Sequence, residues 1–464
     1  MRHAHTVEQV RAAEAALMAQ LPPGALMQRA ATGLAVACAQ RLTRVYASRV
    51  VLLVGRGDNG ADALWAGAML QRRGAVVRAV LTGEPRADAL AAFRAAGGRV
   101  VDEVGPGLVV DGLVGIGGRG ALRDAAAALA AEVRDRDVVA VDLPSGVDAD
   151  TGEVAGAAVR AGLTVTFGTL KPGLLLARGH VGELQLVDIG LTLPTAPVEV
   201  LEDADVERLL PRPRRGDDKY TRGVVGVAAG SQTYTGAAVL SVGAAVRGGA
   251  GMVRFAGAPL AAEQVRSHWP EAVVSELEGA AVVMAGRVQA WVVGPGLGTD
   301  ARAAETLEAV LGEDVPVLVD ADALTIAAQH PEWLSRRTAP TLLTPHDREL
   351  ARFGRDVTAD RIGSARALAT ELGVTVLLKG DATVVTGPDG PARVNATGSA
   401  ALATAGTGDV LAGAAGALLA QGLDPLDAGS VAAHLHGVAG RRAAGGGATS
   451  ASAVLAHWPA RLEP

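Results

Sequence analysis

Short apolar runs recur along the whole chain, and each of them ends in a glycine or in a polar residue. Residues 50–54 (VVLLV) run directly into Gly55, and residues 138–141 (VVAV) run directly into Asp142. Such runs, separated by stretches with helical spacing of apolar residues, predict parallel strands that alternate with helices. The chain is therefore expected to be an α/β protein. Ligands in open sheets of this class bind outside the carboxyl ends of the strands, so polar residues there are the first candidates for a site.

The length and composition indicate a soluble protein with two or three domains. The chain has 464 residues, which exceeds what one hydrophobic core usually organises. Its formal net charge of −6 gives no basic surface for nucleic acid. The single cysteine, Cys38, excludes an intrachain disulfide and a cysteine-based metal cluster. We expect a cytoplasmic protein without a membrane partner, because neither a signal peptide nor an apolar stretch of spanning length is visible.

A change in composition predicts a domain boundary near residue 200. Between Leu191 and Asp217 the chain is rich in proline and arginine, which predicts a linker with a short helix at residues 203–210. We therefore expect one domain at residues 1–200 and a second at residues 201–464. The first has the strand, glycine-rich turn and helix order of a Rossmann-like three-layer domain.

Three expected strands of the first domain end in oxygen-bearing side chains. These side chains are Asp58, Asn59 and Asp62 after the first strand, Asp111 after another, and Asp142 and Ser145 after a third. Carboxylate, amide and hydroxyl groups gathered at one sheet edge suit a hard cation and acid–base chemistry. Any one of them alone is better explained by a helix cap or a turn. Their occurrence after three strands favours a site.

The first strand is followed by the spacing GxGxxG, formed by Gly55, Gly57 and Gly60. In dinucleotide-binding proteins this turn is accompanied by an acidic residue at the end of the next strand. Here the next strand runs on into Thr82 and Gly83 instead. The motif alone is therefore weak evidence for a dinucleotide.

Several segments of the first domain resemble the NAD(P)H-hydrate epimerases. The turn GRGDNGAD is similar to that family's GNNGGDG turn, residues 26–30 to its LMERAG helix, and residues 109–120, 141–152 and 166–173 to its other signatures. The resemblance implies that Asn59, Asp111 and Ser145 bind K⁺, and that Asp142 is the base that moves the proton at carbon 6 of the hydrated nicotinamide. It implies a substrate-binding surface of Asp58, Asn59, Gly60, Ala61, Asp62, Gly115, Ile116, Gly117, Gly118, Arg119, Gly120, Ala121 and Asp142.

The chain departs from the epimerase pattern in the turn. Asp58 replaces an asparagine, Ala61 and Ala63 replace glycines, and Gln28 replaces a glutamate. The carboxylate of Asp58 adds negative charge close to where a phosphorylated substrate would bind.

In the second domain the stretch LATAGTGDVLAG (residues 402–413) predicts an anion site. Gly406 and Gly408 allow a tight turn, and a buried helix is expected to start just after Thr407. The N-terminus of a helix binds phosphate through its free N–H groups and its partial positive charge. Asp409 would repel a phosphate there, but it could take a proton from a hydroxyl that attacks one. The alternative is an ordinary helix start whose acidic residue complements the dipole.

The same stretch resembles the signature of the ribokinase-like superfamily. The segments KYTRG, GPGLG, DADAL, LLTPHDREL, LLKGDATVV and LATAGTGDVLAG follow one another as in the ADP/ATP-dependent NAD(P)H-hydrate dehydratases. The resemblance implies a ribokinase-like α/β domain in which Asp409 is the general base and contacts the hydrated cofactor together with Ala238, Gly298 and His346. It implies a nucleotide site of Lys379, Gly380, Asp381, Ala382, Thr383, Ser399, Ala400, Ala401, Leu402, Ala403, Thr404, Ala405, Gly406, Thr407 and Gly408.

Together the two halves resemble the bifunctional NAD(P)H-hydrate repair enzymes. The resemblance implies that the first half interconverts the R and S hydrates of NADH and NADPH (NADHX and NADPHX). The second half would dehydrate the S hydrate with ADP as co-substrate, giving AMP and phosphate. The cofactors expected are K⁺ in the epimerase site and, as a further candidate, Mg²⁺. A homo-oligomer is also expected.

Two alternatives stay open at this point. One is a ribokinase-like vitamin-precursor kinase fused to a non-catalytic nucleotide-binding module. The other is a first half that only binds, as a regulatory or scaffolding module, because its altered turn has lost catalysis.

Overall fold

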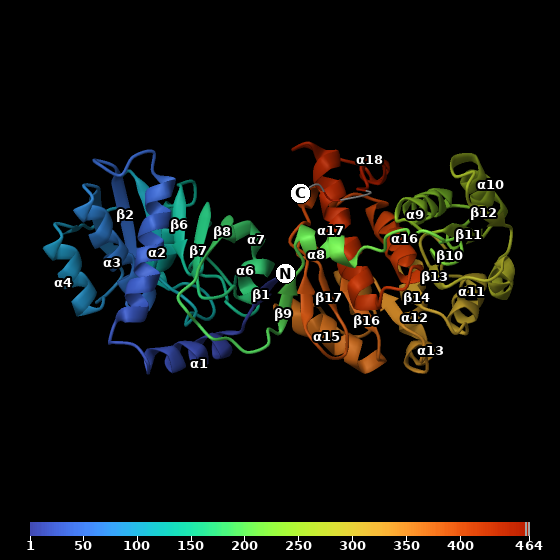
Figure 1. Cartoon of the computed structure of the whole chain (residues 1–464), viewed down its shortest axis with the longest axis horizontal. Helices are drawn as coiled ribbons and strands as arrows, with labels where there is room; N and C mark the ends of the chain where they lie inside the picture. Colours follow the sequence, from blue (N-terminus) through green and yellow to red (C-terminus); the bar gives the residue numbers. More distant parts are fainter. Residues whose placement is uncertain (460–461, 463–464) are drawn as a thin grey trace. The chain divides into compact units, whose positions relative to one another are not determined.

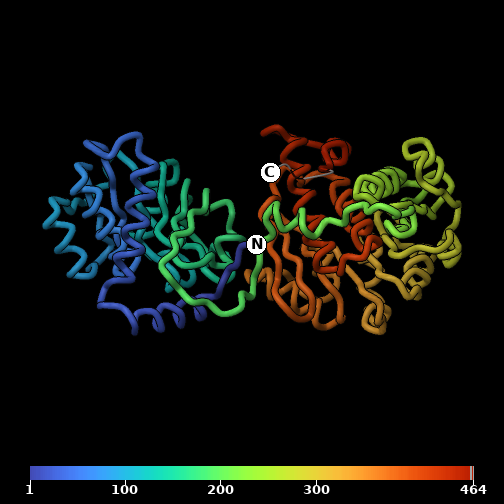
Figure 2. The backbone as a smooth tube through the Cα atoms, in the orientation of Figure 1, coloured from blue at the N-terminus to red at the C-terminus, as the bar shows by residue number. Residues whose placement is uncertain are grey.

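The computed structural model describes residues 1–459 and 462, which form two compact units. One unit is His3–Val198, and the other comprises Met1–Arg2 and the chain from Glu199 onward. Figures 1 and 2 show the first unit in blue to green and the second in green to red. No helix within the described residues combines the length and the apolar character needed to cross a membrane.

The first unit contains, within the described residues, a sheet of seven parallel strands. In spatial order they are β4 (Arg99–Val100), β3 (Val76–Leu81), β2 (Arg49–Val54), β5 (Leu108–Gly112), β6 (Val138–Val141), β7 (Leu163–Phe167) and β8 (Glu183–Val187). The chain runs from β2 outward to β3 and β4, and then returns to β5 on the other side of β2. The strand order therefore reverses between β2 and β5. In sheets of this kind the reversal leaves a crevice at the carboxyl ends of the two strands, where ligands bind.

Helices cover both faces of this sheet (Figure 1). The helices of this unit are α1 (Val7–Met18), α2 (Ala25–Arg41), α3 (Asp58–Arg72), α4 (Ala87–Ala95), α5 (Asp124–Glu132), α6 (Pro172–Leu176) and α7 (Arg178–Val181). On one face α2, α3 and α4 bury Leu34, Leu64 and Phe93 against β2 and β3. On the other face Ala130 of α5 joins a cluster with Val109. The predicted three-layer α/β arrangement of the first half is confirmed.

The second unit is built on a larger sheet. Within the described residues its eleven strands lie in the order β1 (Arg2–Ala4), β9 (Val198–Val200), β18 (Ala392–Val394), β17 (Val384–Thr386), β16 (Thr375–Leu378), β15 (Thr341–Leu343), β14 (Val317–Val319), β13 (Ala290–Val293), β10 (Val224–Ala228), β11 (Met252–Ala256) and β12 (Val273–Ser275). The pairs from β12 to β16 are parallel, and β17 pairs antiparallel with both β16 and β18.

The second sheet is also covered by helices. They are α8 (Asp203–Leu209), α9 (Thr235–Arg247), α10 (Pro259–His268), α11 (Ala301–Leu311), α12 (Asp322–Gln329), α13 (Pro331–Ser335), α14 (Asp347–Ala351), α15 (Arg361–Leu372), α16 (Thr407–Ala420), α17 (Pro425–Ala444) and α18 (Ala451–Ala456), with 3₁₀ turns η1 (Gly279–Ala285) and η2 (Ala400–Leu402). Helices α9, α10, α16 and α17 bury their apolar side chains against alternate strand residues such as Val225, Val292 and Leu342. In Figure 1, α11, α12 and α15 lie on the opposite side of the strands.

The segment predicted as a linker is partly built into the second unit. The chain passes between the units at Val198 and Glu199, close to the predicted boundary at residue 200. The predicted short helix is present as α8, and its Val206 is buried with Leu201 in the core of the second unit. These apolar residues therefore anchor a segment whose proline and arginine content suggested a free connection.

Candidate active sites

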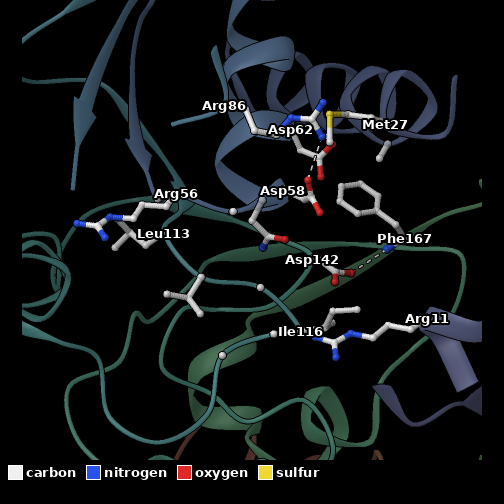
Figure 3. Close-up of a pocket in the computed structure, with 18 of the residues that line it drawn as sticks. Arg11, Met27, Arg56, Asp58, Asp62, Arg86, Leu113, Ile116, Asp142 and Phe167 are labelled. Atoms are coloured by element: carbon white, nitrogen blue, oxygen red, sulfur yellow. Dashed lines mark hydrogen bonds and ion pairs between the residues drawn. The ribbon is translucent and has the colours of Figure 1, made fainter. Parts of the chain in front are cut away.

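A cavity of about 1140 Å³ opens at the carboxyl ends of β2, β5 and β6 in the first unit (Figure 3). Its lining includes most of the residues predicted to bind substrate there: Asp58, Asn59, Asp62, Gly115, Ile116, Gly117, Gly118, Arg119, Gly120, Ala121 and Asp142. Gly60 and Ala61 are buried inside α3 and do not line the cavity. These two residues could contribute to binding only by shaping the turn.

Asp142 lies directly after β6, in a left-handed backbone conformation with φ of 65°. Such a conformation is uncommon for residues other than glycine, and it often marks a functional position. The Oδ1 atom of Asp142 accepts hydrogen bonds from Thr166 Oγ1 at 3.0 Å, Phe167 N at 3.2 Å and Lys171 Nζ at 2.5 Å. None of these bonds involves the other oxygen, Oδ2, which is the one left to meet a ligand in the cavity.

Lys171 is a site residue that the sequence reasoning did not identify. Its side chain is 1% exposed, and its ammonium also donates to Thr166 Oγ1 at 3.0 Å and to the Phe167 carbonyl at 3.1 Å. All three ammonium protons are therefore used, and the Asp142 carboxylate is fixed in one orientation. The lysine was visible only as part of a matching segment, because nothing in the local pattern shows that the loop after β7 reaches the end of β6.

Asp111 and Ser145 are buried in contact with each other, and Asn59, the third predicted K⁺ ligand, lines the cavity. The Asp111 carboxylate is completely buried and accepts from Ser145 Oγ at 2.7 Å and Ser145 N at 2.8 Å. Burial raises the pKa of Asp111 to about 6. Asn59 donates through Nδ2 to the Val141 carbonyl at 2.5 Å, and a Cβ at residue 115 would lie 2.1 Å from Asn59 Oδ1. Only a glycine at position 115 therefore leaves this oxygen free.

The chemistry of this donor set fits a hard cation. Carboxylate, amide and hydroxyl oxygens are the ligands that such ions prefer. A cation would also compensate the buried charge of Asp111, which has hydrogen-bond donors but no basic side chain as an ion-pair partner among the described residues. The three predicted K⁺ ligands are thus compatible with that ion.

Asp62 faces the cavity from α3 and is only 7% exposed. Its Oδ1 atom has no hydrogen-bond partner within the described part of the chain. Burial, followed by the nearby charges of Asp142, Asp58 and Glu14, raises the pKa of Asp62 well above its ordinary value. The cavity therefore holds one buried carboxyl group whose pKa is raised, beside a second that is paired with a lysine.

In the second unit the predicted glycine turn leads directly into a helix. Gly406 has a left-handed φ of 87° and is the N-cap of α16, which begins at Thr407 as the sequence predicted. Thr407 Oγ1 donates to the carbonyls of Leu402 and Thr404 at 2.8 and 2.9 Å, which holds the turn closed. A Cβ at Gly408 would lie 3.6 Å from Lys379 Nζ, so the lysine ammonium and the helix N-terminus meet.

Lys379, at the end of β16, lies among acidic residues. Its Nζ atom is 2.7 Å from Asp320 Oδ1 and 3.5 Å from Glu349 Oε2. Burial would lower the pKa of Lys379, but the two carboxylates outweigh burial and raise it. Lys379 is therefore positively charged and turned toward the turn before α16.

Asp409 lies in the first turn of α16. Burial is the largest cause that raises its pKa to about 7; Asp320, Asp322 and Glu349 add to the rise and Lys379 opposes it. A pKa near the working pH is what a general base needs, because the group is then often ionised and still basic enough to accept a proton.

The remaining predicted contacts of the second unit have different surroundings. His346 caps α14, where its Nδ1 accepts from Glu349 N at 3.2 Å, and its side chain is half exposed. Gly298 donates its N–H to Asp322 Oδ2 at 2.9 Å, and nothing lies within 4 Å of a Cβ placed on it. Ala238 is fully buried, so its side chain does not reach an open surface.

The predicted nucleotide segments contain one notable polar atom. Ser399 Oγ is buried and has no hydrogen-bond partner within the described residues. In the other segment Thr383 Oγ1 closes a turn by donating to the Gly380 carbonyl at 2.9 Å. The sequence reasoning assigned no role to Asp320, Asp322 and Glu349, although the first two follow β14 at a strand end, the signal used elsewhere in the chain.

Comparisons with known proteins match both halves of the chain. A family model described as NAD(P)H-hydrate dehydratase matches residues 225–457, and one described as YjeF-related protein N-terminus matches residues 23–173. A solved ribokinase-like superfamily protein from Enterococcus faecalis is similar to 58% of this chain and 96% of its own, with 25% identity and a TM-score of 0.52. The predicted ribokinase-like fold of the second half is thereby confirmed.

Two curated relatives cover nearly the whole chain. The bifunctional NAD(P)H-hydrate repair enzyme of Mycobacterium leprae is 52% identical over 98% of both chains. That of Mycobacterium tuberculosis is 54% identical over 91% of this chain and 90% of its own. At this identity and coverage, the chain belongs to the family of bifunctional NAD(P)H-hydrate repair enzymes.

Proposed function

We propose that this chain repairs hydrated NADH and NADPH at two separate sites. The first unit epimerises the R and S hydrates in the cavity beside Asp142. The second unit dehydrates the S hydrate with ADP at the N-terminus of α16, giving NAD(P)H, AMP and phosphate. The observation that carries this assignment is the juxtaposition of Asp409, whose pKa is about 7, with Lys379 at a helix N-terminus. A phosphoryl transfer to a hydroxyl needs a base, a cation and an anion site in that arrangement.

The dehydration has to remove a hydroxyl group, which is a poor leaving group. The ring hydroxyl of the hydrate leaves with difficulty until a phosphoryl group is attached to it. Asp409 takes the proton of that hydroxyl while its oxygen forms a bond to the β-phosphorus of ADP, and the bond from that phosphorus to AMP breaks. Lys379 and the free N–H groups that follow Gly406 stabilise the charge on the phosphoryl oxygens. Elimination of phosphate with loss of a ring proton then restores NAD(P)H.

In the first unit Asp142 acts as the base of the epimerisation. Lys171 holds Asp142 through Oδ1, which leaves Oδ2 to exchange a proton with the substrate. Asn59, Asp111 and Ser145 would hold the K⁺ ion, which supplies positive charge beside the substrate when bound. Asp62, whose pKa is raised, would donate a hydrogen bond to the hydrate.

The kinase alternative is not favoured. A vitamin-precursor kinase fused to a binding module would give the first cavity no substrate of its own. The relatives that match nearly the full length of this chain are repair enzymes in which both halves occur together.

The proposal is tested by supplying the purified full-length chain with both hydrate epimers and ADP. Recovery of reduced-nicotinamide absorbance is then followed to its end point. Complete recovery is expected, because the epimerase converts the R hydrate into the form that the dehydratase consumes. Recovery that stops when only the S hydrate is used up would remove the epimerase assignment. An absence of recovery with ADP would remove the dehydratase assignment.

A further inference from the structure

The first unit carries the backbone features of a dinucleotide site more fully than its sequence suggested. Its sheet reverses strand order between β2 and β5, and the glycine turn after β2 lies at that reversal. A Cβ on Gly55 would lie 1.8 Å from the Leu113 carbonyl oxygen, and one on Gly60 would lie 2.3 Å from the Gly55 carbonyl oxygen. A Cβ on Gly57 would meet nothing within 4 Å, and this residue lines the cavity.

These three positions match the roles that glycines have in dinucleotide turns. The first allows the tight turn, the second lets a pyrophosphate approach the backbone, and the third allows close packing of helix on strand. In that arrangement the adenosine half of a dinucleotide lies over the second strand of the unit, here β3, and the nicotinamide half lies on the other side of the reversal. Asp142 lies on that other side, after β6.

The end of β3 lacks the acidic residue that usually binds the ribose 2′-hydroxyl of NAD. Thr82 lines the cavity there, whereas Glu84, the next acidic residue, does not. The side chain of Arg56 lies at the end of β3 instead. A Cβ atom placed on Gly83, two residues after this strand, would be 2.2 Å from Arg56 Nε. An arginine at this position accommodates a 2′-phosphate in proteins that bind the phosphorylated dinucleotide.

We infer that Arg56 binds the 2′-phosphate of NADPHX and makes the first unit prefer this hydrate to NADHX. The inference rests on the proposed epimerase function of the same cavity. Arg56 is exposed, lines the cavity, and makes no ion pair within the described residues, so its guanidinium is available for a phosphate. Figure 3 shows Arg56 and Phe167 on opposite sides of the view, with Asp142 between them.

Other arginines of the cavity are less suited to this role. Arg86 is already paired with Asp58 at 3.1 Å and with Asp88 at 2.7 Å. Arg119 and Arg123 belong to the loop that follows β5, and Arg11 belongs to α1, so none of them follows β2 or β3. Arg56 is therefore the arginine whose position matches the adenosine end.

The test compares Arg56→Gln with a matched control, Arg72→Gln, in the full-length chain. Arg72 is an exposed arginine in the last turn of α3 and does not line the cavity. Interconversion of the R and S hydrates is followed by chromatography without ADP, so that the second unit cannot consume either epimer. The parent is expected to show a higher kcat/KM for NADPHX than for NADHX.

Arg56→Gln is expected to lower kcat/KM for NADPHX about tenfold, mainly through KM, because a charge-assisted contact to phosphate is lost. NADHX should change less than about twofold, and Arg72→Gln should change neither hydrate by more than that. Equal effects of Arg56→Gln on the two hydrates would overturn the inference while leaving the epimerase function in place.

A second measurement separates the inference from the proposed function. The parent and the Arg56→Gln variant are titrated with NADP⁺ and with NAD⁺ in a calorimeter. If neither hydrate were epimerised, the proposed function would fail, but the titration would still decide the inference. Arg56→Gln should weaken NADP⁺ binding and spare NAD⁺, and an unchanged NADP⁺ affinity would refute the role of Arg56.

Discussion

At the scale of single residues, the two proposed bases have opposite electrostatic surroundings. Asp142 is fixed by the buried ammonium of Lys171, whereas burial, with a smaller contribution from nearby carboxylates, raises the pKa of Asp409 to about 7 against the opposing charge of Lys379. The first arrangement orients an ionised group, and the second keeps a group close to its titration point. Each setting leads to a distinct prediction.

Lys171→Met should abolish most of the epimerisation and spare the dehydration. The Asp142 carboxylate would lose its ion-pair partner, and a general base out of position costs about a hundredfold or more in rate. An unpaired buried charge should also destabilise the first unit by about 3–5 kcal/mol. Rates are measured with each hydrate, and stability by denaturant unfolding of the full chain.

The double variant Lys171→Met/Asp142→Asn should regain much of the stability but remain inactive. Epimerisation at the parent rate in Lys171→Met would contradict the positioning role.

The dehydration should depend on pH through Asp409. Because the ionised form is the base, kcat/KM for the S hydrate is expected to rise with pH up to about 7 and to level off above it. Because the pKa of Asp409 is raised in the folded state, ionisation of this group also lowers the stability of the fold. The folded state holds this proton more tightly than the unfolded chain does, so the contribution of Asp409 to stability falls as pH rises from about 4 to about 7.

Asp409→Asn should therefore melt at a higher temperature than the parent at pH 8, while it loses dehydration. Melting curves at pH 8 and pH 5 check the sign, because the difference should shrink at the lower pH. If the variant melted at a lower temperature than the parent at pH 8, ionisation of Asp409 would not destabilise the folded protein.

At the scale of elements, the N-terminus of α16 depends on how closely this helix approaches α9. A Cβ on Gly413 would lie 2.1 Å from the Ser241 carbonyl oxygen, so the two helix backbones are in contact. Gly413→Ala should separate them, destabilise the second unit by about 1–3 kcal/mol and slow dehydration by shifting the turn at Gly406. Gly236→Ala, in α9, is the control, because a Cβ there meets nothing within 4 Å. Denaturant unfolding that ranks the two variants equally would refute this account.

The sequence predicted the elements well because local patterns determine them. Apolar runs predicted the parallel strands, the polar residues after these strands predicted Asp142 as a candidate, and the glycine turn before a buried helix predicted Asp409. Pairings between distant loops could not be predicted, as the contacts of Lys171 with Asp142 and of Lys379 with Asp320 show. The role of Gly57 was also hidden, since only the three-dimensional arrangement shows which of the glycines leaves the backbone open to a ligand.

At the scale of the whole molecule, each of the two units carries its own candidate site. The groups around Asp142 all belong to the first unit, and those around Asp409 all belong to the second. Asp142→Asn should therefore stop epimerisation only, so that a mixture of hydrates with ADP recovers only its S share. Asp409→Asn should stop dehydration and leave the exchange of epimers intact.

Separate sites also imply that the S hydrate can leave one molecule and be repaired by another. An equimolar mixture of the Asp142→Asn and Asp409→Asn proteins should then restore complete recovery, because each supplies the reaction that the other lacks. Absorbance recovery is compared with that of each variant alone at the same total concentration. If the mixture recovered no more than Asp142→Asn alone, the hydrate would have to pass between the two sites of a single chain, and independent action of the units would be ruled out.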